Sequence, residues 1–146
     1  MTAALSGTEM AAELEQQFPG SIVESSEESI IVKSDSLLKI AFFLKTASDL
    51  CFDYLTSVTA TDLRQFVEVS YHLTSTVNNH SLVLKVRIGR GDNPTTPSVV
   101  SIWRGADLQE REIYDLMGIS FNGHPNLKRI FLWEGFEGYP LRRDYL

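Results

Sequence analysis

The sequence predicts an α+β fold: a mixed or antiparallel sheet with helices on one face and an extended C-terminal arm. Apolar and polar residues alternate along two consecutive stretches, 66–74 and 82–88, as they do in half-buried strands. Along 7–18, 37–44 and 106–117 the apolar residues recur every three or four positions, which is typical of helices. With 146 residues, 43% hydrophobic and 22% charged, the chain is expected to form a single domain.

The first helix is predicted from its ends. Ser6 and Glu9 have the spacing of a capping box, and the helical pattern stops at Pro19 and Gly20. Two short apolar stretches around a polar turn at 26–28 then predict a hairpin.

The second helix is expected to be well buried. Asp35 or Ser36 can cap it. Its predicted buried stripe consists of Leu37, Ala41 and Leu44, reinforced by Ile40, Phe42 and Phe43.

Three strands are expected to form an antiparallel meander. Asn78 and Asn79 tolerate the turn that would join the strands at 66–74 and 82–88, and 51–62 supplies another strand before them. The face with Glu68, Lys85 and Arg87 should meet solvent or a partner. The apolar face comprises Val67, Val69, Tyr71, Leu73, Leu82, Leu84, Val86 and Ile88.

The C-terminal third is expected to be a loop, a helix and an arm. Glycines and prolines predict a loop at 89–98, and Gly118 is suited to end the helix at 106–117. Beyond Gly118 the sequence lacks a long period and predicts an extended arm rather than core. We therefore expect a compact part at 1–121 and a docking arm of the same domain at 122–146.

Composition argues against several kinds of site. Cys51 is the only cysteine, so the chain has no internal disulfide and cannot supply four thiolates to an iron–sulfur cluster. Its three histidines are scattered, and we expect no bound metal. A net charge of −6 disfavours nucleic-acid binding. Neither a membrane-spanning run nor a signal peptide is recognised, so we expect a soluble, cytoplasmic chain.

The stretch from Glu110 to Pro125 has the composition of an active site. His124 is held on a corner by Pro125, and Arg111 and Asp115 have the spacing of a helical ion pair. A general base needs a positioned partner, and the sequence nominates none. A stand-alone enzyme that uses His124 with Glu110 or Asp115 as an acid–base pair therefore stays an alternative to a structural role.

Two blocks, "EREIYDLMGISFNGHPNLKRI" and "EGYPLRRDYL", resemble the signature of the 30-kilodalton-type subunit of proton-pumping NADH:quinone oxidoreductase, in the respiratory complex I family. One departure is Asp107-Leu108, where the family usually has Asn-Trp. The matching positions are Glu110, Arg111, Glu112, Tyr114, Asp115, Gly118, Ile119, Phe121, His124, Pro125, Arg129, Ile130, Pro140, Leu141, Arg142, Arg143, Asp144 and Tyr145.

The resemblance implies a cofactor-free subunit of the peripheral arm that scaffolds the quinone-site large subunit and its cluster-bearing neighbour. FMN, iron–sulfur clusters and quinone are then expected on partner subunits, and the isolated chain is expected to be inactive. The complex would lie on the cytoplasmic side of the cell membrane, couple electron transfer to proton translocation, and provide the chain's only membrane contact.

The motif residues are expected at subunit interfaces. Arg142 and Arg143 would hold carboxylates of a neighbour, and Glu110, Arg111 and Asp115 would form a buried or interfacial charge network. The expected interface set is Glu110, Arg111, Glu112, Tyr114, Asp115, Gly118, His124, Pro125, Arg129, Pro140, Arg142, Arg143 and Asp144.

Two further alternatives remain open. The chain could be the equivalent subunit of a related complex: an energy-converting hydrogenase, an F420H2 dehydrogenase or a ferredoxin:quinone oxidoreductase. It could also be a free binding module.

Overall fold

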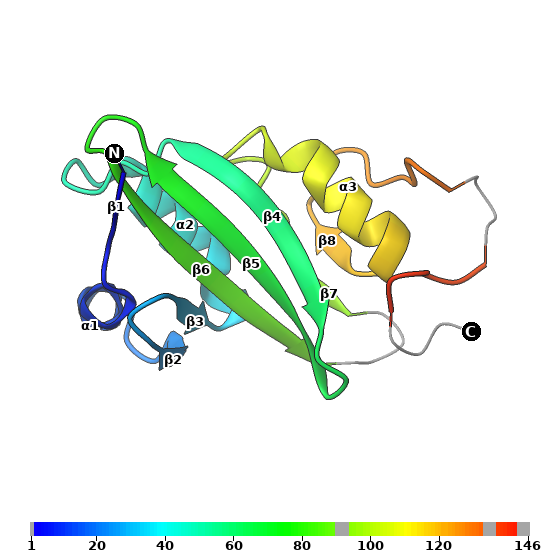
Figure 1. Cartoon of the computed structure of the whole chain (residues 1–146), viewed down its shortest axis with the longest axis horizontal. Helices are drawn as coiled ribbons and strands as arrows, with labels where there is room; N and C mark the ends of the chain where they lie inside the picture. The colour runs from blue at the N-terminus through cyan, green and yellow to red at the C-terminus, as the bar shows by residue number, and fades with distance from the viewer. Residues whose placement is uncertain (1, 90–93, 133–136, 143–146) are drawn as a thin grey trace.

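A computed structural model describes residues 2–89, 94–132 and 137–142 of the chain. The helices are α1 (Gly7–Gln17), α2 (Leu37–Thr46) and α3 (Ala106–Met117), with a 3-10 turn, η1 (Ser34–Ser36), before α2. The main sheet contains β1 (Ala3–Ala4), β2 (Ile22–Ser25), β3 (Ile30–Val32), β4 (Tyr54–Asp62), β5 (Phe66–Ser75) and β6 (His80–Gly89). A second sheet pairs β7 (Thr95–Pro97) with β8 (Ser120–Asn122). The predicted α+β class is confirmed (Figure 1).

The antiparallel meander β4–β5–β6 is the centre of the main sheet, as predicted. Val69 of β5 lies opposite Ala60 of β4 and Val86 of β6. Asn79 adopts φ +56° in the turn between β5 and β6, a conformation that asparagine tolerates better than most residues. Along β5 and β6, the apolar side chains of the predicted inner face are all buried, and the side chains that alternate with them are half-buried or exposed, so the predicted inner face is confirmed.

Parallel pairing makes the sheet mixed. The predicted hairpin β2–β3 forms, and β3 then pairs in parallel with β6, with Ile31 opposite Lys85. β1 also pairs in parallel with β6, nearer its start, where Ala3 lies opposite His80. The strand order is β2-β3-β6-β5-β4.

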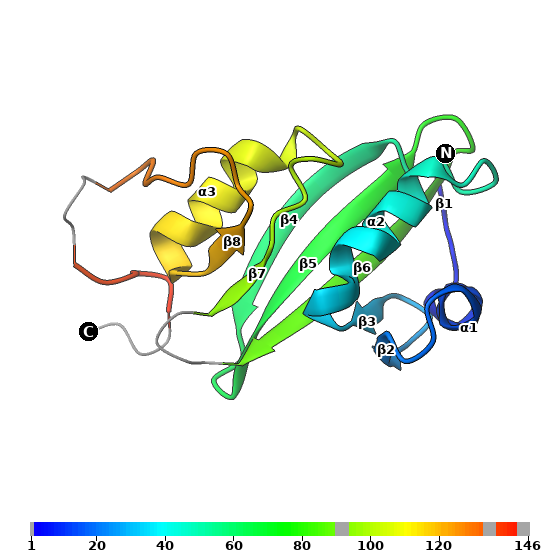
Figure 2. The ribbon, with the colours of Figure 1, turned by 180° about the vertical axis from the view of Figure 1, so that it is seen from behind.

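Helix α2 covers the inner face of the sheet, and β7 lies on the same side (Figure 2). Four of its side chains are buried in the core: Leu37, Ile40, Ala41 and Leu44. The prediction that Phe42 joins this stripe is wrong, because its side chain points away from the core and is 61% exposed. Ser36 occupies the N-cap position without a side-chain capping bond, since η1 leads directly into the helix.

Helix α1 packs beside the β2–β3 hairpin, at the end of the sheet far from α3 (Figure 1). Ser6 caps it as predicted, and its hydroxyl accepts the N–H of Glu9 at 3.3 Å. Met10 and Leu14 are buried against the sheet.

The predicted loop and arm contribute more to the fold than expected. Thr95–Pro97, expected to be loop, forms β7, which pairs in parallel with β8. Ile119 and Phe121, in the stretch beyond Gly118 that lacks a long period, are buried in the core at 0% and 2% exposure. Residues 90–93 of the predicted loop lie outside the described residues. Because β7 precedes α3 and β8 follows it, their pairing fixes both ends of the helix against the main sheet.

Within the described ranges, no helix combines the length and apolar composition that a bilayer crossing requires.

Candidate functional site

Helix α3 carries most of the motif residues and lies beside β4 (Figure 1). Its buried stripe contains Ala106, Glu110, Ile113 and Met117, which recur at helical spacing. A carboxylate therefore stands in the middle of an otherwise apolar stripe.

Glu110 binds the segment that precedes α3. Its side chain is fully buried, with one carboxylate oxygen 2.6 Å from the Ser98 hydroxyl and the other accepting the Val99 N–H at 2.9 Å. Burial raises the pKa of Glu110, and the hydrogen bonds from Ser98 and Val99 offset only part of the rise. Burial, followed by the nearby Glu110 carboxylate, also raises the pKa of Tyr71.

Asp115 binds the segment that follows α3. One oxygen, Oδ2, accepts three consecutive backbone N–H groups, from Ile130 at 3.0 Å, Phe131 at 2.6 Å and Leu132 at 3.2 Å. The other oxygen lies 3.2 Å from Nη1 of Arg129. Burial alone would raise the pKa of Asp115, but these N–H groups and the Arg129 guanidinium together lower it.

The arm also caps the C-terminus of α3. The last carbonyls of a helix have no partner within the helix and attract cations. Arg129 donates to the carbonyl of Asp115 at 3.1 Å, the N–H of Leu141 donates to Leu116 at 2.9 Å, and Nε of Arg142 donates to Met117 at 2.6 Å. Nε of Arg142 thus serves its own helix, and the sequence-based expectation that the guanidinium group also binds a neighbour's carboxylate stays a prediction.

Gly118 and Tyr139 form the contact at the centre of this cap. Gly118 ends the helix with φ +74°, as predicted, and a side chain there would place its Cβ 2.5 Å from the Tyr139 ring. Two guanidinium groups lie within cation–π distance of the ring, with Arg129 at 4.9 Å and Arg142 at 5.3 Å from its centroid. The Tyr114 ring is 6.5 Å away.

His124 fixes the start of the arm to the other end of α3. Its side chain is fully buried, and its Nδ1 accepts the N–H of Asn126 at 2.9 Å, which assigns the proton of the neutral ring to Nε2. Nε2 lies 3.1 Å from the carbonyl oxygen and 3.0 Å from Oδ1 of Asp107. We assign the hydrogen bond to the carbonyl, because the direction to Oδ1 does not meet hydrogen-bond geometry. Both ring nitrogens are thus occupied within the chain.

Arg111 does not pair with Asp115, so the predicted helical ion pair is wrong. Its Nε donates to the carbonyl of Lys128 at 3.2 Å, and Asp115 takes Arg129 as its ion partner. The expected network of Glu110, Arg111 and Asp115 is replaced by three separate sets of contacts from α3 to its flanking segments.

The remaining motif residues differ in their exposure to solvent. Glu112 and Pro125 are exposed, Pro140 is half-buried, and Arg143 and Asp144 lie outside the described residues. The sequence-based site omitted Tyr139, Ser98 and Asp107. Tyr139 stands within the second motif block, which is the signal that could have identified it. Ser98 carried no such signal, because its role depends on a contact with Glu110, twelve residues away.

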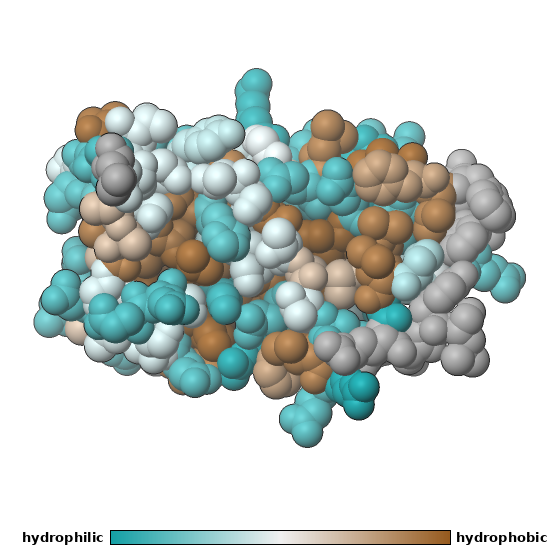
Figure 3. Space-filling model, viewed as in Figure 1, coloured by the Kyte–Doolittle hydropathy of each residue, from teal (hydrophilic) through white to brown (hydrophobic). Residues whose placement is uncertain are grey.

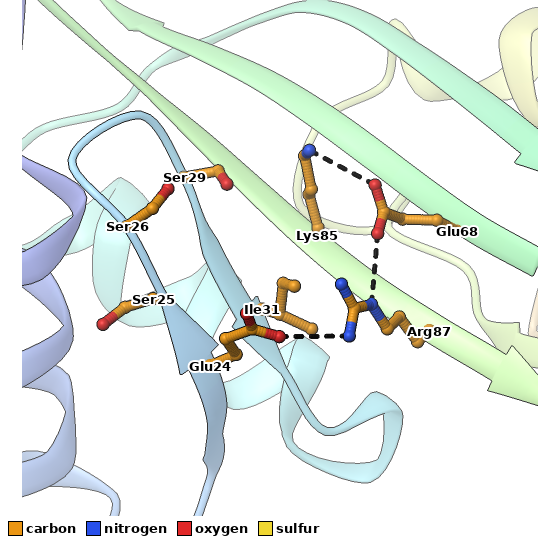
Figure 4. Close-up of a pocket in the computed structure, with 8 residues that line it drawn as sticks. All are labelled: Glu24, Ser25, Ser26, Ser29, Ile31, Glu68, Lys85 and Arg87. Atoms are coloured by element: carbon orange, nitrogen blue, oxygen red, sulfur yellow. Dashed lines mark hydrogen bonds and ion pairs between the residues drawn. The ribbon is translucent and has the colours of Figure 1, made fainter.

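The outer face of the sheet has a shallow depression of about 240 Å³ (Figure 4). Arg87 of β6 lies between Glu24 at 3.1 Å and Glu68 at 3.2 Å, and Lys85 is 3.2 Å from the other oxygen of Glu68. Two acids and two bases neutralise one another here, so the depression has no unbalanced charge for an ionic ligand. It lies on the predicted polar face of the sheet.

The contacts of α3 with the segments before and after it have a structural role. The described residues contain no group of three histidine, cysteine, aspartate or glutamate side chains placed to bind a metal. The carboxylates of Glu110 and Asp115 and the His124 ring all bond to their own chain. The arrangement can hold the arm in one position and present its outward side chains.

The fold occurs in a known respiratory assembly. The chain superposes on a chain in the solved structure of the membrane-bound sulfane sulfur reductase, an archaeal respiratory membrane complex, with a TM-score of 0.76. The match covers 94% of this chain and 84% of the other at 23% identity, a likeness that shows the fold alone.

The family follows from sequence comparison. Residues 30–146 match the family described as the 30-kilodalton subunit of respiratory-chain NADH dehydrogenase. An NADH-quinone oxidoreductase subunit of Roseiflexus castenholzii is 36% identical over 97% of this chain and 84% of its own length. The subunit of the same name in Moorella thermoacetica is 37% identical over 91% of this chain and 90% of its own length. A Rhizobium meliloti relative, also named as a subunit of NADH-quinone oxidoreductase, is 40% identical over 78% of this chain and 63% of its own length.

The chain belongs to the family of the 30-kilodalton subunit of respiratory-chain NADH dehydrogenase, and the relatives just described are NADH-quinone oxidoreductase subunits. The family resemblance inferred from the two motif blocks is thereby confirmed.

Proposed function

We propose that this chain is a cofactor-free scaffold subunit of a membrane-associated NADH:quinone oxidoreductase. The observation that carries the proposal is how the buried residues of the family motif are used. Asp115 and His124 hold the arm on α3, and Glu110 holds the segment before α3, instead of facing a substrate. Asp115 alone accepts three backbone N–H groups and an arginine. A subunit that positions its neighbours needs such a rigid, outward-facing segment.

The same contacts argue against a stand-alone acid–base enzyme. A general base needs a free nitrogen or oxygen within reach of a substrate proton. His124 is fully buried with both ring nitrogens engaged, and both carboxylate oxygens of Glu110 accept hydrogen bonds from the chain. Neither side chain retains such a group.

The chemistry of electron transfer then belongs to partners. One cysteine cannot ligate a four-thiolate cluster, so this proposal assigns the iron–sulfur clusters to other subunits. The family resemblance implies the same for FMN and quinone. The partners in this proposal are the quinone-site large subunit and its cluster-bearing neighbour. The complex would lie on the cytoplasmic side of the cell membrane and couple electron transfer to proton translocation.

A related membrane complex is the second candidate. The likeness to a chain of the sulfane sulfur reductase means that the fold does not separate the two. The names of the relatives at 36–40% identity favour the NADH:quinone complex.

Gene deletion tests the proposal. Membranes from cells that lack the chain should lose NADH:quinone oxidoreduction, and the full-length tagged chain should restore it and co-purify with the other subunits. The purified chain alone should not oxidise NADH. Activity of the isolated chain, or co-purification with the large subunit of a hydrogenase, would contradict the proposal.

A further inference from the structure

Two apolar side chains of the arm are exposed beside α3. Ile130 is 37% and Phe131 is 62% exposed, and we call this pair the apolar tip. Leu141, 60% exposed, lies at the same end of α3, because its N–H bonds the carbonyl of Leu116. Apolar side chains gather over α3 and beside it on the surface of the molecule (Figure 3). Contiguous exposed apolar groups of this kind mark interaction surfaces.

Hydrogen bonds to the buried Asp115 carboxylate hold the backbone of the apolar tip in place. Both of its N–H groups, and that of Leu132, donate to Oδ2 of the buried Asp115. Arg129, the residue before the tip, binds the other Asp115 oxygen and the carbonyl of Gly138 at 3.1 Å. A loop fixed by a buried carboxylate loses little conformational entropy on binding, which favours affinity.

We propose that the apolar tip inserts into an apolar pocket of a neighbouring subunit of the same oxidoreductase. The inference rests on the proposed function and adds to it the surface that makes the contact. Phenylalanine is among the aromatic residues that are enriched at protein interfaces, where buried aromatic side chains act as anchors.

The charge of the chain favours a protein over a lipid surface as the occupant. Segments that bind the cytoplasmic membrane face carry clusters of lysine and arginine. This chain has a net charge of −6. Of the basic side chains in 128–142, Arg129 and Arg142 are engaged with α3, so the exposed Lys128 is a single lysine rather than a cluster. The relatives are moreover named as subunits, so neighbouring proteins are available.

Phe131→Ala in the full-length tagged chain tests the inference, with Phe42→Ala as a matched control. Phe42 is 61% exposed, nearly the same as Phe131, but lies on α2. Each variant replaces the wild-type gene, and mass spectrometry quantifies the oxidoreductase subunits that co-purify from solubilised membranes. Phe131→Ala should reduce their yield at least about tenfold, and Phe42→Ala should leave it unchanged. Equal yields from the two variants would overturn the inference.

A photo-crosslinking phenylalanine analogue at position 131 identifies the occupant, with the analogue at position 42 as control. A crosslink from position 131 to another oxidoreductase subunit supports the inference. A crosslink to a second copy of this chain or to lipid, or no crosslink, overturns it. Failure of the wild-type chain to retain any oxidoreductase subunit would instead overturn the proposed function, so the two failures are distinguishable.

Discussion

The two buried carboxylates of α3 respond to their surroundings in opposite directions. Glu110 receives two hydrogen bonds in an apolar stripe, and its pKa is raised. Asp115 receives three N–H groups and a guanidinium, and its pKa is lowered. Burial acts to raise both pKa values, and only at Asp115 do the N–H groups and the Arg129 charge together outweigh it.

The stability of the Glu110→Gln variant relative to wild type should increase as the pH rises. A raised pKa in the folded state means that Glu110 supports folding below its ordinary value of 4.5 and that this support is lost as the pH rises through the folded pKa. Glutamine keeps an acceptor oxygen and does not ionise. The free energy of unfolding of the variant relative to wild type, measured by urea denaturation between pH 4 and pH 8, should increase with pH. A difference that does not change with pH would contradict the role of ionisation.

Gly118→Ala should destabilise the protein more than Gly123→Ala. Both glycines have positive φ, +74° and +85°, so alanine costs about 1–2 kcal/mol of backbone strain at either position. Only at Gly118 does the added Cβ meet the Tyr139 ring, whereas Gly123 has open space. Chemical denaturation should show the larger loss for Gly118→Ala, together with faster hydrogen exchange at the Leu141 N–H. Equal losses would mean that the ring moves aside at no cost.

At the scale of single residues, the sequence predicted local backbone conformation better than it predicted which side chains would pair. The positive φ of Gly118 follows from its place after a helical pattern, and the local turn after His124 follows from Pro125. The partner of Asp115 could not be predicted, because Arg111 has helical spacing and Arg129 reaches Asp115 only after the chain reverses.

Among the elements, α3 and the arm are coupled through side chains as much as through backbone. Three of the last four carbonyls of α3 are bonded by arm residues Arg129, Leu141 and Arg142. The arm is therefore expected to loosen as a unit when its main anchor is weakened.

Asp115→Asn should release the arm without unfolding the sheet. The amide keeps one acceptor but loses the charge, which should cost roughly 2 kcal/mol. Hydrogen exchange at the Ile130, Phe131 and Leu132 amides should accelerate by about tenfold or more, with β5 amides unchanged. The pKa of Asp115 in the folded protein is lowered from its ordinary value of 3.8, so its charge stabilises the fold fully above that value. The stability difference from wild type should therefore diminish as the pH falls below about 3.8 and Asp115 becomes protonated.

Asp53→Asn is the matched control. Hydrogen bonds from Thr76 lower the pKa of Asp53 as well, but this pair lies between the start of β4 and the end of β5 and does not contact the arm. The control should leave exchange at Ile130–Leu132 unchanged. Acceleration in both variants would indicate a general loss of stability.

At element scale the long, periodic segments were predictable and the short paired ones were not. Alternation in 66–74 and 82–88 identified β5 and β6, because ten-residue strands contain several repeats of the pattern. β7 and β8 have three residues each and pair across α3, so neither contains enough repeats for a period. The sequence pattern beyond Gly118 therefore does not indicate that Ile119 and Phe121 are core residues, although both are buried.

Across the whole molecule, the sheet and α2 provide a core that the arm joins from one end (Figure 2). The boundary between compact part and arm at 121/122 stays a prediction. Contacts of His124, Arg129 and Arg142 with α3 indicate that the arm adds to stability even though β8 ends at Asn122.

A chain that ends at Asn122 should fold with reduced stability. It keeps the main sheet, α2 and β8, but loses the donors that satisfy the C-terminal carbonyls of α3. Urea denaturation followed by near-ultraviolet circular dichroism should show one cooperative transition at a lower midpoint. A chain without cooperative unfolding would instead place residues beyond 122 within the compact part.

The parallel pairing of β6 with β1 and β3 illustrates the limit of sequence reasoning at this scale. Ile31 and Lys85 are 54 positions apart, and neither stretch has a sequence pattern that predicts which strand it pairs with. The two motif blocks, by contrast, identified the family, because many spaced positions matched at once.

The hydrogen bond from Val58 N–H to Gln109 Oε1, at 2.7 Å, affects more than the packing of α3. β4 is the last strand of the main sheet, and an open strand edge is a template on which another chain can add a strand. The Gln109 side chain occupies this donor in the middle of β4. A strand from another molecule would have to displace this glutamine before it could pair with the middle of β4, so the contact opposes edge-to-edge association of copies of the chain.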